Sequence, residues 1–451
     1  KQHSSMRISF LKKIFQNDLF LSDEAIKKYS KDESLISIKP FAIVTPRRKS
    51  QIVKLVRWAR KEKIGIIPRG SGTGLAGGAV GKGIILDLKE MKKIKISKND
   101  LMVECEPGVI NSDLQKKLEK EGFFWPPDPS SWKECTIGGN LATNAGGISC
   151  LKYGVTNNWV LSLDVIDGNG DFFRTGSKAI KDVSGYDMTN LFIGSEGTLG
   201  VITNSYLKIC KIPKSNATII ATYKNFDIAA KKVEEIRKEG FLPQALEILD
   251  NKTLGAVNNH HNLNLGKDCS LLLCECSGNK KKVEEEVEKI KPIIKKKSID
   301  FRYSFSKKER DKLWIARRGV LESLKKLGKV HVEDITVPVG SLSKMVKKID
   351  LISKKYKIEI FTMGHGGDGN LHPQFIIEKN LDYSKKMKNA RFEILNEAVK
   401  MNGTITGEHG IGLAKKESFY ENTDLIKIQK MKKIKNVFDP FGIMNPGKIF
   451  K

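Results

Sequence analysis

The stretch Pro68-Arg-Gly-Ser-Gly-Thr-Gly-Leu-Ala-Gly-Gly-Ala79 decides the fold of the first half of the chain. It contains Gly72-x-Gly74-x-x-Gly77, the spacing of a dinucleotide fingerprint, but a Rossmann fingerprint must open a helix. Here a buried strand, Ile64 to Ile67, precedes the loop and a second strand, Ile84 to Leu88, follows it. We therefore predict strand, glycine loop, strand, with clustered backbone N–H groups that suit a phosphate or pyrophosphate.

Two more glycine-rich stretches follow in the same half of the chain. Asp128 to Gly147 is almost free of charge after Glu134, and Gly185 to Thr203 runs into the predicted strand Val201 to Cys210. Small side chains, hydroxyls and amides let the backbone approach a flat, polar ligand closely. An ordinary long turn is the alternative, but the first loop holds more glycine than a turn needs.

In order and spacing, the three loops resemble the flavin-binding half of the FAD-linked oxidase superfamily, of the vanillyl-alcohol-oxidase type. The match runs from about Phe41 to Pro213. The resemblance implies that the first loop holds the pyrophosphate of FAD and that the other two line the flavin. The residues implied to bind FAD are Pro68, Arg69, Gly70, Ser71, Gly72, Thr73, Gly74, Leu75, Pro129, Ser130, Thr136, Gly138, Gly139, Asn140, Ala142, Thr143, Asn144, Gly146, Gly147, Tyr153, Gly154, Glu196, Gly197, Gly200, Ile202 and Asn445. Cys135 and Cys150 are the nearby candidates for a covalent tether; neither is an evident one, so we expect noncovalent FAD.

A second cluster of glycines surrounds His365, His372 and His409, in Phe361 to His372 and Gly407 to Gly412. Strand-like runs flank the Gly-Gly-Asp-Gly-Asn turn, so His365 leaves one strand and His372 enters the next. The two imidazoles can share an ion, with Glu408 as the third ligand. This set suits zinc, manganese or iron and leaves positions open for water or substrate. Solvated histidines in two glycine turns are the alternative.

The second half of the chain carries further motifs. They are Trp314-x-x-Arg317, Glu333-Asp-Ile-Thr-Val-Pro338, Gly364-His-x-Gly-Asp-Gly-Asn-Leu-His372, Gly407-Glu-His-Gly410 and Asp439-Pro-x-Gly-Ile-Met-Asn-Pro-Gly-Lys448. Together they resemble the C-terminal domain shared by GlcD-type glycolate oxidases, D-lactate dehydrogenases and D-2-hydroxyglutarate dehydrogenases. The resemblance implies a divalent metal on His365, His372 and Glu408, a base in His409, a carboxylate clamp in Arg317, and contacts of Asn370 and Asn445 with substrate and flavin.

The activity implied by the resemblance is oxidation of a 2-hydroxy acid to a 2-oxo acid. The metal would stabilise the alkoxide, His409 would accept the hydroxyl proton, and the Cα hydride would pass to flavin N5. We predict D-lactate or glycolate as substrate, because Val332 stands where relatives that use 2-hydroxyglutarate tend to carry lysine. D-2-hydroxyglutarate is the alternative if His331 or a lysine from another loop replaces that contact. A metal-dependent hydrolase and a lysine-rich binding protein are alternatives of other classes.

The predicted fold class is α+β, with a two-part FAD-binding domain and an α+β substrate domain. We expect four segments: a helical segment, 1–37; the FAD-binding domain, 38–213; the substrate domain, 214–405; and a C-terminal segment, 406–451, that returns to the flavin. The chain opens on Lys1 rather than Met, and two interpretations stay open: residues 1–5 are a remnant before a natural start at Met6, or they are native.

Composition restricts the partners. The formal net charge is +28, but the lysines are spread through every predicted helix and no nucleic-acid module is recognised, so we expect no nucleic-acid partner. The seven cysteines are scattered and form no CxxC pair, which fits reduced thiols in the cytoplasm and no iron–sulfur cluster. Electrons are then expected to leave to a quinone, a separate iron–sulfur protein or another carrier. No apolar run approaches the roughly 18 residues of a membrane span, and peripheral association with the inner face of the membrane is an alternative.

Overall fold

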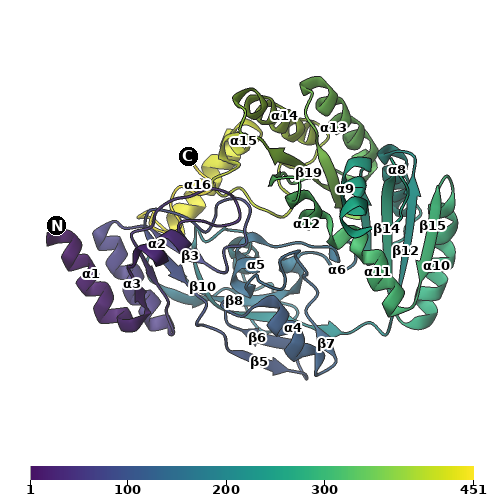
Figure 1. The fold of residues 1–451 in the computed structure, drawn as a ribbon. Coiled ribbons are helices and arrows are strands. Elements are labelled where there is room, and N and C mark those ends of the chain that lie inside the picture. The colour runs from purple at the N-terminus through teal and green to yellow at the C-terminus, as the bar shows by residue number, and fades with distance from the viewer. Residues whose placement is uncertain (1) are drawn as a thin grey trace. The chain divides into compact units, whose positions relative to one another are not determined.

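The computed structural model describes residues 2–451, and of residues 2–5 only the backbone; Lys1, in the segment 1–5 that is either a remnant or native, lies outside the described residues. The chain forms two compact units (Figure 1). The first comprises Lys1–Gly146, Val155–Ile212 and Glu408–Lys451, and the second comprises Gly147–Gly154 and Pro213–Gly407. Each unit is described by itself below.

The first unit begins with a small sheet in the order β1 (Leu19–Phe20), β2 (Ala42–Val44), β4 (Ile84–Asp87), β3 (Ile66–Arg69). β2, β4 and β3 are parallel, and both faces of such strands are normally covered. The helix α3 (Lys49–Glu62) packs Ile52, Leu55, Val56 and Ala59 into the core that includes Leu11 of α1 (Gln2–Phe15). The C-terminal segment adds to the edge of β3, because Ile66 N donates to Ile443 O at 2.7 Å.

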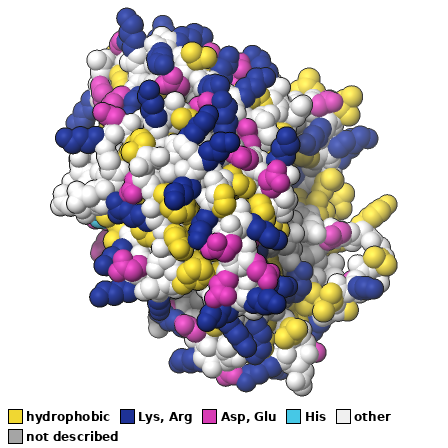
Figure 2. All heavy atoms as spheres, turned by 90° about the vertical axis from the view of Figure 1, so that its right-hand side faces the viewer, with side chains coloured by type: hydrophobic (Ala, Val, Ile, Leu, Met, Phe, Trp, Pro, Cys, Tyr) yellow, Lys and Arg dark blue, Asp and Glu magenta, His cyan; other side chains and the backbone are white. Residues whose placement is uncertain are grey.

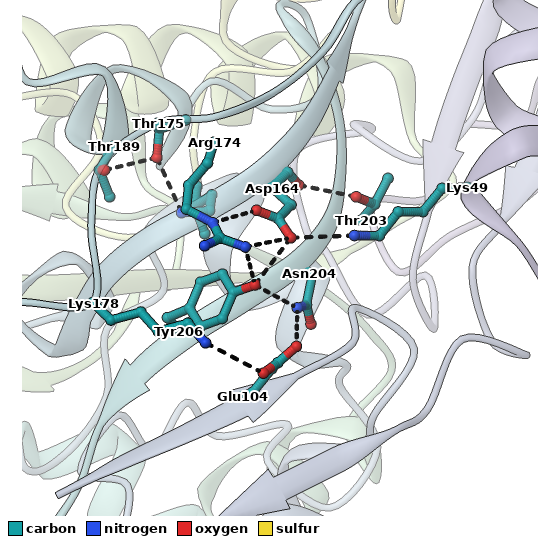
Figure 3. A network of polar contacts seen from close by, with 11 residues as sticks. Lys49, Glu104, Asp164, Arg174, Thr175, Lys178, Thr189, Thr203, Asn204 and Tyr206 are labelled. Carbon is teal, nitrogen blue, oxygen red and sulfur yellow. Dashed lines mark hydrogen bonds and ion pairs between the residues drawn. The ribbon is translucent and has the colours of Figure 1, made fainter. Parts of the chain in front are cut away.

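The second sheet of this unit is antiparallel, in the order β5 (Ile94–Ser97), β6 (Met102–Cys105), β10 (Gly200–Lys208), β8 (Val160–Asp167), β9 (Phe172–Arg174). A buried carboxylate, Asp164 on β8, connects it to α3 (Figure 3). Three side chains donate to the Asp164 carboxylate: Arg174 Nε at 2.8 Å, the Tyr206 hydroxyl at 3.1 Å and Lys49 Nζ at 3.2 Å. Burial acts to raise the pKa of Asp164, but these donors outweigh it, so the pKa is lowered and the carboxylate stays charged.

The first unit contains further helices and one more strand pair. They are α2 (Asp23–Tyr29), α4 (Asn111–Glu119), α5 (Ile137–Thr143), α7 (Met188–Phe192), the pair β7 (Phe123–Phe124) and β11 (Cys210–Lys211), and, in the C-terminal segment, α15 (Lys416–Glu421) and α16 (Leu425–Phe438). Between β3 and β4 no helix intervenes, so the predicted strand, glycine loop, strand order is what the structure has.

The second unit is built on one large antiparallel sheet. Its order is β15 (Asp300–Ser304), β12 (Ser215–Tyr223), β14 (Ser270–Gly278), β13 (Ala245–Leu249), β18 (Phe361–His365), β19 (Asn370–Ile377), β16 (Lys329–Val332), with β17 (Ile335–Thr336) also paired to β19. One face shares a core with α9 (Asn251–His261), α11 (Lys307–Arg318) and α12 (Val320–Lys325). The helices α8 (Phe226–Lys238) and α10 (Lys280–Lys295) also pack on β12 and β14. The unit also contains α6 (Cys150–Tyr153), α13 (Leu342–Tyr356) and α14 (Leu381–Lys400).

Strand alternation decides which residues of this sheet can meet. Ala245 and Leu249 of β13, and Phe361 and Met363 of β18, contribute to the core shared with α9, α11 and α12. Because side chains alternate along a strand, Glu247 and His365 lie on that same face. On the side of the molecule that Figure 2 presents, Lys and Arg lie scattered among Asp and Glu. Across residues 2–451, no helix combines the length and the apolar character that a membrane span requires.

Candidate active site

The glycine loop of the first unit forms a cradle above a buried cation. The guanidinium of Arg69, at the end of β3, donates to Ala79 O at 3.1 Å, and a side chain at Gly72, whose φ is +75°, would collide with it. Burial lowers the pKa of Arg69 from its ordinary value. At Gly74 and Gly78 an added Cβ would meet no atom of the described chain within 4 Å. The protein itself does not require glycine at these two positions, so the open space above them suits a ligand.

The second predicted FAD segment lies beside this loop. Thr136 caps α5 by accepting from Gly139 N at 3.1 Å, and a side chain at Gly70 would collide with the Thr136 hydroxyl. Asn140, one turn along α5, is 2% exposed, yet its Nδ2 has no hydrogen-bond partner within residues 2–451. Buried polar atoms are normally paired, so this amide is a candidate ligand donor.

The third segment contributes Glu196, in a left-handed conformation with φ +56°. Its carboxylate accepts from Gly412 N at 3.0 Å, and Asn445 Nδ2 donates to its backbone oxygen at 2.7 Å and to Gly78 O at 2.9 Å. Burial raises the pKa of Glu196 to about 7. The predicted residues Glu196 and Asn445 thus hold the C-terminal segment against the glycine loop.

Sequence reasoning missed Lys448, which is 2% exposed and donates to Asn445 Oδ1 at 3.0 Å. Its Nζ lies 3.6 Å from where a Cβ at Gly81 would be, so it is a second buried cation beside the glycine loop. Burial lowers the pKa of Lys448 to about 8. The signal was available, since Lys448 closes the quoted Asn-Pro-Gly-Lys motif, but no role was assigned to it.

The structure gathers most of the predicted FAD residues into the first unit. Those on the loop after β3, on α5 and its flanks, and on the start of β10 lie there, and so does Asn445; they run from Pro68 to Gly146 and from Glu196 to Ile202. Gly147, Tyr153 and Gly154 belong to the second unit, where Lys152 donates to Ser277 Oγ at 3.0 Å and Gln244 donates to Ser149 Oγ at 3.0 Å. These three predicted residues are therefore not assembled with the others in one unit.

The histidine pair lies wholly within the second unit. His365 ends β18 and His372 lies on the paired strand β19, with ring centroids 5.4 Å apart and planes at 87°. His365 Nδ1 lies 2.8 Å from Glu247 Oε1, and His372 Nδ1 lies 3.3 Å from Glu333 O. An acceptor held against Nδ1 is the arrangement in which Nε2 of a histidine ligates a metal.

Glu247 is the main residue that sequence reasoning missed. It is fully buried on β13, directly opposite His365 in the strand pairing, and its other oxygen accepts from Arg317 Nε at 2.5 Å. Burial acts to raise the pKa of Glu247, but the charges of His365 and Arg317 and their hydrogen bonds outweigh it, so the pKa is lowered. One carboxylate therefore positions both a predicted metal ligand and the predicted carboxylate clamp.

Both named residues of the Trp-x-x-Arg motif on α11 hydrogen-bond to a buried glutamate of the sheet. Trp314 Nε1 donates to Glu275 at 3.1 Å, and Arg317, one turn later, reaches Glu247. Glu247 engages the Nε of Arg317 rather than either of its two terminal nitrogens. Arg317 is 6% exposed, whereas the side chain of the neighbouring Arg318 is 62% exposed.

Asn370 and Gly407, from two of the predicted motifs, both hydrogen-bond to Asp334. Its Nδ2 donates to Asp334 Oδ1 at 2.7 Å and to Ile335 O at 2.9 Å, and Gly407 N donates to Asp334 Oδ2 at 2.8 Å. Glu408 follows Gly407 by one peptide bond, about 3.8 Å between Cα atoms. Glu408 and His409 belong to the first unit, with His409 Nε2 3.9 Å from Glu408 Oε1. The two predicted histidine ligands and the predicted carboxylate ligand are thus divided between the units.

A second missed residue is Gln374. It follows His372 by two residues on β19, so both side chains lie on the same face of the strand. Gln374 is fully buried, and within residues 2–451 neither its Nε2 nor its Oε1 has a hydrogen-bond partner. It pairs across the strands with Val332 of β16 and with Phe361.

Family models match both halves of the chain. A model of an FAD binding domain matches residues 40–176, and a model of the C-terminal domain of FAD linked oxidases matches residues 212–449, more than half of the chain. The chain belongs to the family of FAD-linked oxidases.

Relatives of this FAD-linked oxidase include proteins named for three different substrates. Glycolate oxidase subunit GlcD of Bacillus subtilis (strain 168) is 41% identical over 418 residues, covering 91% of this chain and 89% of the relative. D-lactate dehydrogenase of Anaerostipes hadrus is 31% identical over 98% of this chain and 96% of its own length. D-2-hydroxyglutarate dehydrogenase of Stutzerimonas stutzeri (strain A1501) is 31% identical over 98% of both chains.

The fold agrees with solved structures. A crystal structure of p-cresol methylhydroxylase with substrate bound matches with a TM-score of 0.82 and 16% identity, covering 100% of this chain and 97% of that chain. The predicted fold class, a two-part FAD-binding fold of the vanillyl-alcohol-oxidase type joined to an α+β domain, is therefore confirmed. The predicted family is confirmed as well.

The residues of this FAD-linked oxidase fit its cofactor. Open space above Gly74 and Gly78 and two buried cations, Arg69 and Lys448, suit a pyrophosphate. The orphan amide of Asn140 offers a donor to a polar ligand. Identification as an FAD-linked oxidase favours redox chemistry over the hydrolase and binding-protein alternatives.

Proposed function

We propose that this FAD-linked oxidase is a dehydrogenase that converts a small D-2-hydroxy acid, D-lactate or glycolate, to the 2-oxo acid. The observation that carries the proposal is the buried Glu247 carboxylate, which contacts His365 at 2.8 Å and Arg317 at 2.5 Å. It pairs a cation for a substrate carboxylate with a histidine of the type that ligates a metal. The names of the relatives above point to the same class of substrate.

Arg317 binds the substrate carboxylate in this proposal. Glu247 holds Nε, which orients the planar guanidinium and leaves the two terminal nitrogens for a two-pronged contact with the carboxylate. Lysine could not reproduce this contact, because its ammonium is a point charge. Glu247 also keeps Arg317 neutralised when substrate is absent.

In this proposal the substrate hydroxyl is deprotonated with the help of three histidines and Glu408. His365, His372 and Glu408 would hold a divalent ion, zinc or alternatively manganese or iron, whose charge lowers the pKa of a nearby hydroxyl. His409 takes the hydroxyl proton on its imidazole, the side chain that most often serves as a general base in enzymes. Bound FAD supplies the acceptor for the two electrons that leave the substrate.

Substrate size is the finer part of the proposal. Val332 lies opposite Gln374, so the positions next to His372 on this face of the sheet carry an apolar side chain and a neutral amide rather than a second cation. His331 alternates to the other face of β16, where it meets Glu333 at 2.9 Å, and Arg391 Nε also donates to Glu333 at 2.6 Å. A missing charge-assisted contact costs roughly 1.5–3 kcal/mol, or about ten- to a hundredfold in affinity for a dicarboxylate.

The electron acceptor is proposed to be a quinone, an iron–sulfur partner or another carrier. None of the seven cysteines forms a disulfide in the described chain and they lie scattered, with Cys274 and Cys276 buried in β14. This distribution does not suit an iron–sulfur cluster within the described chain. We place the protein in the cytoplasm, with the inner face of the membrane as the alternative.

The test is kcat/KM for D-lactate, glycolate, L-lactate and D-2-hydroxyglutarate with an artificial dye as acceptor. We expect D-lactate or glycolate to be preferred at least about tenfold over D-2-hydroxyglutarate. Val332→Lys should shift the ratio toward D-2-hydroxyglutarate, and Val330→Ala, at a nearby apolar position of the same strand, should not. A clear preference of the wild-type enzyme for D-2-hydroxyglutarate contradicts the proposal.

A further inference from the structure

A second pair of histidines lies in the second unit and is not used by the proposed function. His260 and His261 end α9, and Glu322 projects from α12. One ligand atom from each of the three residues lies within 4.8 Å of the others. We propose that His260, His261 and Glu322 form a binding site for one transition-metal ion of the Zn²⁺ class, and that this ion connects α9 to α12.

Two of the three ligands already have the spacing of a metal site. His260 Nε2 lies 3.2 Å from Glu322 Oε1, and the two imidazole rings are 4.4 Å apart at 70°. Ligand atoms about 2.0–2.1 Å from a tetrahedral zinc ion are roughly 3.4 Å apart. The separations that involve His261 are at most 4.8 Å, about 1.5 Å more than tetrahedral zinc needs. The side chain of Glu322 is 65% exposed, so it can change rotamer to follow the ion.

His261 shows that the site is built into the fold. Its Nε2 is buried and has no hydrogen-bond partner within residues 2–451, although buried polar atoms are normally paired. A Cβ at Gly319 would lie 2.5 Å from this nitrogen. Gly319 has φ −78° and ψ −3°, which any residue adopts, so the imidazole rather than the backbone requires glycine there. The chain thus makes room for an imidazole whose nitrogen lacks a partner.

The donor set selects the ion. Two imidazoles and one carboxylate favour Zn²⁺, Ni²⁺ or Cu²⁺ over Mg²⁺ and Ca²⁺, which prefer oxygen ligands. Both histidines lie in the last turn of α9, where the helix dipole stabilises a cation. Lys326 is the nearby positive charge that opposes binding. The partial exposure of His260 leaves the remaining coordination position to water.

The proposed ion site lies close in sequence to Arg317. α12 starts at Val320, three residues after Arg317, and Gly319 lies between them against the His261 ring. An ion that joins Glu322 to the end of α9 stabilises the segment that follows Arg317. The site shares no residue with the His365–His372 pair, so it does not depend on the proposed function.

Zn²⁺ binding to the FAD-loaded full chain tests the inference by equilibrium dialysis with elemental analysis and by the Zn²⁺-induced rise in Tm. The His372→Ala background removes the other candidate site. In that background we expect the protein to bind one equivalent of Zn²⁺. His260→Ala and Glu322→Gln should each lower the affinity for Zn²⁺ at least about tenfold. Asn259→Ala, an exposed neighbour on α9, should bind Zn²⁺ as its parent does. Both test residues are partly or largely exposed, so folding is preserved; equal Zn²⁺ binding and equal Tm shifts in all four proteins overturn the inference.

Discussion

Glu247 and His365 stand directly opposite each other in the β13–β18 pairing, with Glu247 Oε1 2.8 Å from His365 Nδ1. We predict that Glu247→Gln weakens metal binding and kcat/KM each by about 10–100-fold, because a neutral amide orients and polarises the imidazole less well. Metal content and steady-state kinetics measure both effects. Glu275→Gln is the control: Glu275 is buried on the same face and binds Arg310 and Trp314, so its loss should lower Tm and leave the metal content unchanged.

Gln374 should show a trade-off between stability and activity. Its buried amide has no partner among the described residues, which costs about 1–3 kcal/mol. Gln374→Met removes that cost at similar volume, so Tm should stay the same or rise. We propose that the unpartnered amide contacts substrate, so kcat/KM should fall about tenfold in the same variant. The comparison is Gln115→Met. The Gln115 amide donates to the backbone oxygen of Trp125 and accepts from its N–H, so this variant should have a lower Tm than the wild type. Full activity of Gln374→Met would exclude a substrate contact.

The buried Glu196 predicts a pH dependence of stability. Its folded pKa is about 7, above its ordinary value of 4.5, so the folded state holds a proton that the unfolded state has released. The free energy of unfolding should therefore fall as pH rises from about 4.5 to about 7, by roughly 3 kcal/mol from this group. Glu196→Gln keeps an acceptor for Gly412 N and removes the titration. The Tm difference between the variant and the wild type should grow over this range and level off above pH 7; a constant difference contradicts the assignment.

We predict that FAD is bound noncovalently. Cys135, one candidate tether, is 4% exposed, and burial raises the pKa of its thiol to about 11, so little reactive thiolate forms. The other, Cys150, accepts a hydrogen bond from Gly147 N at 2.9 Å. Acid precipitation should release the yellow colour into the supernatant, and flavin retained on the denatured chain would contradict this.

We predict that metal removal affects turnover but not flavin binding. The predicted FAD residues lie mainly in the first unit and the histidine pair in the second. A strong chelator, or His372→Ala, should therefore abolish turnover and leave the flavin absorbance spectrum largely unchanged. Turnover that persists in protein shown to be free of metal by elemental analysis would rule out the metal-assisted mechanism.

The local sequence determined much of this protein. Gly72 to Gly77 between two apolar runs predicted a strand, glycine loop, strand, because a helix-opening fingerprint would need a helical pattern after it. The strand-like apolar runs on either side of the Gly-Gly-Asp-Gly-Asn turn likewise predicted that His365 and His372 lie on neighbouring strands, as the structure has them. Turn chemistry and strand period act over a few residues, so they can be predicted from the sequence.

Only the tertiary structure brought out Glu247 and Gln374, and only it showed that Lys448 of the quoted motif is buried beside the glycine loop. Glu247 is 118 residues before His365, and nothing in the apolar run around it separates it from an ordinary strand glutamate. Its role follows from strand register, because a shift by one residue would turn its side chain to the opposite face of the sheet. Gln374 is notable only because its buried amide lacks a partner, which depends on the packing around it. Register and burial are set by contacts between distant segments, so the sequence alone did not determine them.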